Sequence, residues 1–167
     1  MTTIRPATLD DAAACARVYA PYVTDSVISF EATPPTADDM AGRMRVAHEW
    51  LVAEVDGDVV GYAYSGKHKD RAAYAWAADV AVYIDATSHR RGIGRALYGE
   101  LFPLLRERGL RMLCAGVTLP NDKSVGIHLA MGFEPVGIYR KIGWKFGRWH
   151  DVAWYQLDLA PGDDGPP

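Results

Sequence analysis

Hydrophobic residues recur along this chain at two spacings, which alternate from one segment to the next. Apolar positions three or four residues apart predict helices, and short apolar runs between turn residues predict strands. The predicted strands cover residues 4–7, 51–55, 59–64, 74–84, 112–117, 136–139 and 152–159. The predicted helices are one that begins after an N-cap at Thr8 and others over residues 37–50, 92–108 and 121–131. This order predicts a mixed α/β fold.

A single domain accounts for the pattern. A chain of 167 residues is long enough to bury a sizeable core, and neither a linker nor an internal repeat divides it. We expect residues 1–160 to form this domain. Residues 161–167 are rich in Pro, Gly and Asp, a composition that predicts a disordered tail.

Composition then narrows the classes of function. A net charge of −3 argues against nucleic acid as a partner, because nucleic-acid-binding domains are strongly basic. The longest apolar runs are too short to span a membrane, so no membrane partner is expected. Cys15 and Cys114 lie in predicted helix and strand segments, without a disulfide framework or a secretory signal. These features predict reduced core cysteines and a cytoplasmic location.

The most informative segment is a basic, glycine-containing loop between a predicted strand and a predicted helix. Its glycines let the backbone approach a ligand closely, and its arginines surround that backbone with positive charge. The first N–H groups of a helix also lack partners within the helix and attract anions. We therefore predict a diphosphate site formed by Arg90, Arg91, Gly92, Ile93, Gly94 and Arg95.

Spacing distinguishes between the possible diphosphate ligands. A Walker loop requires Gly-Lys-Ser/Thr, which the chain lacks, and a dinucleotide loop requires a third glycine where Leu97 stands. The pattern Arg90-x-Gly92-x-Gly94 instead resembles the acyl-CoA loop of the GCN5-related N-acetyltransferases, the GNAT superfamily. The plain structural alternative is a glycine turn with a solvated basic rim.

A second motif carries the same resemblance. The spacing from Asn121 through Ser124 and His128 to Gly132-Phe133 is similar to the last-helix pattern of that superfamily. A histidine at position 128, in place of the usual tyrosine, resembles the phosphinothricin and methionine sulfoximine acetyltransferase branch. Three further runs are similar to that branch: Arg71-x-x-Tyr74-x-Trp76, Leu119-Pro120-Asn121-Asp122 and Lys145-x-Gly147-x-Trp149-His150-Asp151.

The resemblance implies a fold and a reaction. The fold is the GNAT acyltransferase fold, a central mixed and mostly antiparallel sheet flanked by helices. The reaction is acetyl transfer from acetyl-CoA, with no metal, to the α-amine of a small molecule such as phosphinothricin, methionine sulfoximine or methionine sulfone, by direct attack in a ternary complex. The resemblance also implies a homodimer.

Two residues are candidates for the general base that removes the amine proton. Asp79 stands on the predicted central strand where the family usually has Glu, and its side chain is one methylene shorter. His128 is the second candidate, because histidine titrates in the range that suits acid or base work. The structural alternatives are a solvated carboxylate at a strand end and a hydrogen-bonded histidine on a helix face.

The remaining site residues follow from the same resemblance. Backbone groups of Val82, Tyr83 and Ile84 are expected to pair with the pantetheine arm as an added strand, and N–H groups near Val82 or Tyr83 to polarise the thioester carbonyl. Asn121 is expected to bind the cofactor near its reactive end. The expected residues of the acceptor site are Phe30, Lys69, Arg71 and Tyr74, with the two cations facing the acceptor's anionic groups.

Two rival functions stay open at this point. One keeps the enzyme class but changes the acceptor to another small amine or a peptide N-terminus. The other is a non-catalytic module that binds acyl-CoA, which would keep the loop and lose the base. The presence of both Asp79 and His128 argues against the second rival.

Overall fold

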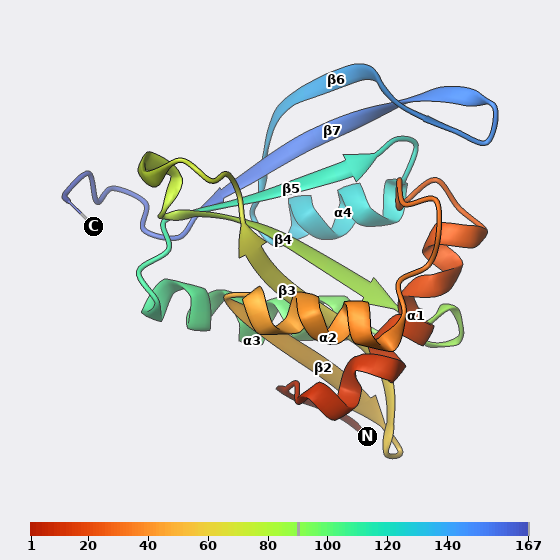
Figure 1. The fold of residues 1–167 in the computed structure, drawn as a ribbon. Coiled ribbons are helices and arrows are strands. Elements are labelled where there is room, and N and C mark those ends of the chain that lie inside the picture. The colour runs from red at the N-terminus through yellow and green to blue at the C-terminus, as the bar shows by residue number, and fades with distance from the viewer. Residues whose placement is uncertain (90, 167) are drawn as a thin grey trace.

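The computed structural model describes residues 1–89 and 91–166, and there it forms one seven-stranded sheet flanked by helices (Figure 1). The strands are β1 (Thr2–Pro6), β2 (Glu49–Val55), β3 (Asp58–Lys67), β4 (Ala77–Ile84), β5 (Met112–Thr118), β6 (Glu134–Lys145) and β7 (Arg148–Asp158). The α-helices are α1 (Ala12–Thr24), α2 (Ala37–Val46), α3 (Ile93–Glu107) and α4 (Asp122–Ala130). The predicted mixed α/β fold is confirmed.

The sheet opens between its two central strands. The strand order is β1-β2-β3-β4-β5-β7-β6, and only β4 and β5 pair in parallel. Their pairing runs from Ala77 opposite Met112 to Asp79 opposite Cys114. Beyond Asp79 the two strands spread apart, while β4 continues to Ile84 beside β3 (Figure 1). Residues 80–84 therefore keep one edge that no described strand covers.

Alternate residues of the central strands contribute to two separate cores. In β2, Leu51 packs in the core with α3, whereas Val52 packs in the core with α1 and α2. In β4, Val82 packs toward α3 and Tyr83 toward α1. Because side chains alternate with a period of two, Asp79 lies on the same face of β4 as Tyr83.

One predicted helix is too long. The segment predicted as helical over residues 37–50 leaves the helix after Val46, where Ala47 adopts an extended conformation. Glu49 and Trp50 already belong to β2 and pair with β3. Pairing in the sheet outweighs the helical pattern at this end of the segment, because it gives these backbone groups hydrogen-bond partners.

The strand predictions also need correction at their ends. The central strand predicted from Tyr74 begins at Ala77, where its pairing with β5 starts, and residues 72–74 form a short 3₁₀ helix instead. The last two strands are longer than predicted, because β6 and β7 pair as one long hairpin over residues 134–158. This hairpin reaches beyond the rest of the sheet in Figure 1.

Three further observations on the described residues concern membrane crossing, the cysteines and the C-terminal tail. Within the part that the structure describes, no helix has both the length and the apolar character needed to cross a membrane. Cys15 is fully buried in α1 and Cys114 is half-buried in β5, and both are free thiols. In the tail, Asp163 forms an ion pair with Arg111 at 3.0 Å. The disorder expected for residues 161–167 stays a prediction.

Candidate active site

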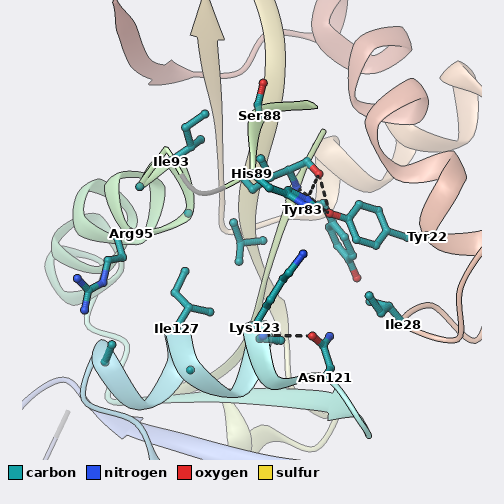
Figure 2. A pocket seen from close by; sticks show the side chains of 17 residues that line it. Tyr22, Ile28, Tyr83, Ser88, His89, Ile93, Arg95, Asn121, Lys123 and Ile127 are labelled. Carbon is teal, nitrogen blue, oxygen red and sulfur yellow. Dashed lines mark hydrogen bonds between the residues drawn. The ribbon is translucent and has the colours of Figure 1, made fainter. Parts of the chain in front are cut away.

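A cavity of about 620 Å³ lies between the end of β4, the beginning of α3 and α4 (Figure 2). Most of the residues predicted to bind the cofactor line it, and they come from three separate segments of the chain. They are Val82, Tyr83, Ile84, Gly92, Ile93, Gly94, Arg95 and Asn121. Arg91 is exposed and does not line this cavity, and Arg90 lies outside the described residues. We refer to this space as the cofactor cavity.

The two loop glycines serve different purposes at the start of α3. Gly92 is the N-cap of the helix and has a φ of 74°, a conformation that favours glycine. At Gly94 a Cβ atom would lie 2.8 Å from the Cδ1 atom of Ile127, so a side chain there would force the end of the Ile127 side chain to move. Together they leave the first N–H groups of a 15-residue helix facing the cavity, which suits an anion.

The uncovered edge of β4 forms another wall. The Asp85 N–H donates to the Val60 carbonyl on β3, whereas the Ile84 carbonyl accepts from the Tyr22 hydroxyl at 2.6 Å. Backbone groups of successive strand residues point to opposite edges. The N–H and carbonyl of Val82 therefore point away from β3, toward the opening between β4 and β5.

Side chains that the sequence analysis did not select complete the cofactor cavity. Tyr22, Ile28 and Lys123 line it, and Figure 2 shows Lys123 extending from α4 toward Tyr83. Arg95 turns outward in the same view. Tyr22 and Ile28 lie far from the loop along the chain, so no local motif pointed to them.

A second cavity, of about 690 Å³, opens on the neighbouring part of β4. Asp79, Phe30 and Glu31 line it together with residues of β5, β6 and β7. Tyr83 and Ile28 line both cavities, so the two spaces meet at these side chains. We refer to the second space as the acceptor cavity. A group carried in the first cavity and a molecule held in the second would meet beside the uncovered edge of β4.

Asp79 is the carboxylate of β4 that lines the acceptor cavity. Its side chain is 41% exposed, and its Oδ1 atom lies 2.6 Å from Nδ1 of His68. Burial raises the pKa of Asp79 above its ordinary value, and the hydrogen bond from His68 lowers it in part. A carboxylate with a raised pKa is better suited to accept a proton than an ordinary aspartate.

His68 was missed in the sequence analysis, although the hairpin register gives a signal. Gly66 pairs with Asp79 across β3 and β4, so the residue two positions after Gly66 stays near that carboxylate. The thiol of Cys114 also lies close, with donor atoms of the three side chains within 4.8 Å of one another. A cation there would have to break the bond between His68 and Asp79, so the group fits a hydrogen-bonded pair better than a metal site.

His128 belongs to α4 and its side chain lies in the core. It is 4% exposed, and it lines neither cavity. Its Nδ1 atom is 2.7 Å from the Ser124 carbonyl, and its Nε2 atom is 3.1 Å from the Tyr98 hydroxyl. Burial lowers its pKa. Both ring nitrogens are therefore engaged on the core side of the helix.

Of the four predicted acceptor residues, the structure places one, Phe30, in the lining of the acceptor cavity. Phe30 lines the acceptor cavity and lies against Gly143 of β6, where a Cβ atom would collide with its ring. Lys69 is exposed but close enough to Asp79 to lower the pKa of that carboxyl group. Arg71 and Tyr74 are exposed at the short helix before β4, and neither lines the cavity.

Comparisons with known proteins agree with this geometry. The family profile described as an acetyltransferase (GNAT) domain matches residues 4–154. A phosphinothricin N-acetyltransferase of Streptomyces viridochromogenes is 40% identical over 160 residues, covering 93% of this chain and 87% of the relative. An L-methionine sulfoximine/L-methionine sulfone acetyltransferase of Pseudomonas aeruginosa is 30% identical over 172 residues, covering 98% of each.

Solved structures agree as well. A GNAT superfamily phosphinothricin acetyltransferase from Sinorhizobium meliloti, crystallised in complex with acetyl-CoA, superimposes with a TM-score of 0.93. It is 31% identical in sequence, and the superposition covers 99% of this chain and 92% of that chain.

Proposed function

From the premise that this chain belongs to the GNAT family of acetyltransferases, we propose that it acetylates the α-amine of a small amino-acid analogue. Family membership makes the chain an acetyl-CoA-dependent N-acetyltransferase. The acceptors we propose are phosphinothricin, methionine sulfoximine and methionine sulfone, which relatives at 30–40% identity are named for. The observation that carries the proposal is the meeting of the two cavities beside Asp79 and the uncovered edge of β4.

The cofactor cavity has the features that acetyl-CoA requires. The N-terminus of α3 offers N–H groups to the diphosphate, with Arg95 beside them as a fixed cation. Residues Val82–Ile84 offer backbone groups to the amide-rich pantetheine arm, in the manner of an added strand. Asn121, whose Oδ1 atom already accepts from the Ser124 N–H at 3.2 Å, is positioned on the opposite wall.

Acetyl transfer then needs two contributions from the chain. Asp79 accepts a proton from the ammonium group, and the amine nitrogen so released attacks the thioester carbonyl carbon. The Val82 N–H, which points to the uncovered edge, donates to the carbonyl oxygen as negative charge develops there. The C–N bond forms, the C–S bond breaks, and the sulfur leaves and takes up a proton. The products are an N-acetylated acceptor and a free thiol.

In this proposal His128 has a structural role and does not contact the acceptor. Its bond to the Ser124 carbonyl lies within α4, and its bond to the Tyr98 hydroxyl joins α4 to α3. The geometry supports Asp79 over His128 as the base, because Asp79 lines the acceptor cavity and His128 lines neither cavity.

Recognition of the acceptor carboxylate falls to Lys69 and Arg71 in this proposal. Lys69 is supported by its electrostatic effect on Asp79. Because Lys69 lowers the pKa of that carboxyl group, its positive charge must lie close to the rim of the acceptor cavity. Phe30 supplies an apolar wall for the side chain of the acceptor. Arg71 and Tyr74 would reach it only from the segment before β4.

We also propose a homodimer. Large apolar side chains crowd the β6–β7 hairpin, each at least 46% exposed, and such a surface is typical of an interface. They are Val136, Ile138, Tyr139, Ile142, Trp144, Phe146 and Trp149. Tyr139 and Ile142 also line the acceptor cavity, so a second copy on this hairpin would lie beside the acceptor.

A second candidate acceptor has a specific observation in its favour. Among the described residues, those that line the acceptor cavity include Glu31 and Asp79 but neither Lys nor Arg. Such a lining suits a cationic amine without a carboxylate, or a peptide N-terminus. The two acceptor classes predict different outcomes in one experiment.

The experiment is a panel of amines incubated with acetyl-CoA, in which release of free thiol is followed. The panel contains phosphinothricin, methionine sulfoximine, methionine sulfone, the amine that lacks the carboxylate of methionine sulfone, and a short peptide. We expect the three amino-acid analogues to react, and the decarboxylated amine to have a kcat/KM at least about tenfold lower, because Lys69 and Arg71 lose a partner. Equal rates for the decarboxylated amine would favour the second candidate.

The cofactor assignment has its own test. We expect Gly94→Val to raise the KM for acetyl-CoA more than Arg91→Ala does, because the β-branched valine crowds Ile127 and blocks close approach of the ligand to the backbone. A pantetheine analogue without the nucleotide diphosphate should bind far more weakly than acetyl-CoA. Equal affinity for both molecules would contradict the assignment of the loop.

A further inference from the structure

His68 and Asp79 form a pair at the edge of the acceptor cavity. A carboxylate can only accept a hydrogen bond, so Nδ1 of His68 carries the proton that Asp79 Oδ1 accepts at 2.6 Å. Asp79 lines the acceptor cavity, whereas His68 is not among the residues that line it. The histidine ring lies between Tyr74 and Trp154, with ring centroids 5.7 Å and 6.2 Å away.

We infer that His68 is a positioning residue that orients the carboxylate of Asp79 toward the acceptor amine. This inference rests on the proposed function, in which Asp79 is the base. His68 holds Oδ1, so Oδ2 is the oxygen that remains to accept the proton. The packed ring of His68 limits where Oδ1 can go, since its own rotation is restricted by Tyr74 and Trp154.

A short side chain makes such an anchor useful. The carboxylate of Asp79 must meet an amine that is also held by the acceptor cavity, and general-base catalysis requires the two atoms within hydrogen-bond distance. A carboxylate free to rotate would spend part of its time pointing away from the amine. The hydrogen bond from His68 fixes Oδ1 and so removes this rotational freedom.

Other charged and titratable groups near Asp79 come from every neighbouring element. Lys69 follows His68 along the chain and lowers the pKa of Asp79. Tyr64 on β3 and Cys114 on β5 each interact electrostatically with the carboxylate, and Glu31 lines the same cavity. Of these groups, His68 is the one that donates a hydrogen bond to Asp79 in the described structure. Loss of this bond should therefore raise the pKa of Asp79 further.

The test uses two substitutions that differ in one respect. His68→Phe keeps an aromatic ring against Tyr74 and Trp154 but removes the donor. His68→Asn keeps an N–H group near the position of Nδ1. His48→Phe is a matched control, since His48 is half-buried and bonds to Ser65 at 3.1 Å but lines neither cavity. The readouts are kcat/KM for methionine sulfone as a function of pH and KM for acetyl-CoA.

We expect His68→Phe to lower kcat/KM by about tenfold at pH 7, the loss typical of one hydrogen bond to a charged group. The acidic limb of its pH profile should move to higher pH, because the carboxylate now holds its proton more tightly. His68→Asn should restore most of the rate and the position of the limb. KM for acetyl-CoA should stay unchanged in both variants, and His48→Phe should leave the profile unmoved.

An acidic limb that stays in place in His68→Phe would overturn the inference, as would equal losses in the Phe and Asn variants. If His68→Phe is unstable, His68→Leu gives the same comparison with a smaller side chain. Asp79→Asn separates this failure from failure of the proposed function. If Asp79→Asn keeps the wild-type kcat, Asp79 is not the base and the proposed mechanism fails. If Asp79→Asn is inactive while His68→Phe has a normal profile, only the role of His68 is wrong.

Discussion

Two aspartates, one beside the edge strand β1 and one on the central strand β4, show how surroundings separate a structural carboxylate from the proposed base. Asp11, just before α1, accepts hydrogen bonds from both terminal nitrogens of Arg5 and from the Thr8 N–H, each at 2.8 Å. The bond from Arg5 lowers its pKa. Asp79 receives one side-chain hydrogen bond, from His68, and burial raises its pKa.

The difference lies in the partners and not in burial alone. Asp11 is 8% exposed and is more deeply buried than Asp79. Its negative charge is nevertheless matched by the guanidinium group of Arg5, and both of its carboxylate oxygens accept hydrogen bonds. Such a carboxylate holds β1 to the start of α1 and resists protonation. The charge of Asp79 is only partly offset by His68, and Asp79 lines a cavity, so it can take up a proton. A buried carboxylate therefore indicates a base only when its partners leave its charge partly unmatched.

The largest expected effect separates the two residues by activity. Asp79→Asn keeps the size of the side chain but removes its basicity, so kcat should fall by about 10²–10⁴-fold. Asp11→Asn should leave kcat unchanged. The measurement is thiol release at saturating acetyl-CoA and acceptor. His128→Ala should cost less than Asp79→Asn, and the reverse order would make His128 the base and Asp79 structural.

The next largest expected effect separates Asp11 from Asp79 by the free energy of unfolding. Asp11→Asn should lower the free energy of unfolding by about 1–3 kcal/mol, because it leaves Arg5 with Glu54 as its one remaining ionised partner at a partly exposed site. Asp79→Asn should not lower it, since the substitution removes a charge that burial disfavours. Urea unfolding of the two variants and the wild type measures both values. A destabilised Asp79→Asn variant with a stable Asp11→Asn variant would reverse the comparison.

A third prediction uses pH. The folded pKa of Asp11 is lowered, so its contribution to stability is present above the unfolded value, about 3.9, and is lost as the pH falls through the folded pKa. The difference in unfolding free energy between wild type and Asp11→Asn should therefore shrink toward acidic pH. For Asp79 the raised pKa places the acidic limb of kcat/KM above the ordinary range of aspartate. A limb at or below that range would show that Asp79 is not the titrating base.

The smallest expected effect concerns the length of the side chain. Asp79→Glu restores the residue that the family usually carries, so the variant should stay active, within about one order of magnitude of the wild-type kcat. The added methylene moves the carboxylate toward the acceptor and away from His68. We therefore expect the loss caused by His68→Phe to be smaller in the Asp79→Glu background. Equal losses in both backgrounds would show that the anchor does not depend on side-chain length.

Much of the fold could be read from local patterns. The order of strands and helices, the glycines at the start of α3 and the N-cap Asn121 all depend on residues close together along the chain. The predicted element boundaries were wrong where long-range strand pairing outweighs local helical preference, as at Glu49 and Trp50. The hydrophobic pattern also does not reveal where two parallel strands stop pairing, so the opening beyond Asp79 is known from the structure and not from the residues.

The sequence by itself, through its motifs and the family that they resemble, therefore determined the class of the protein: a mixed α/β acetyltransferase with a glycine-containing helix start and an aspartate on its central strand. Only the tertiary structure decided which side chains meet. It joined Tyr22 and Ile28 to the cofactor cavity, paired His68 with Asp79, and buried His128 against Tyr98. The physical reason is that these contacts link segments far apart along the chain. Strand register and helix packing set them, and no local pattern of residues contains that information.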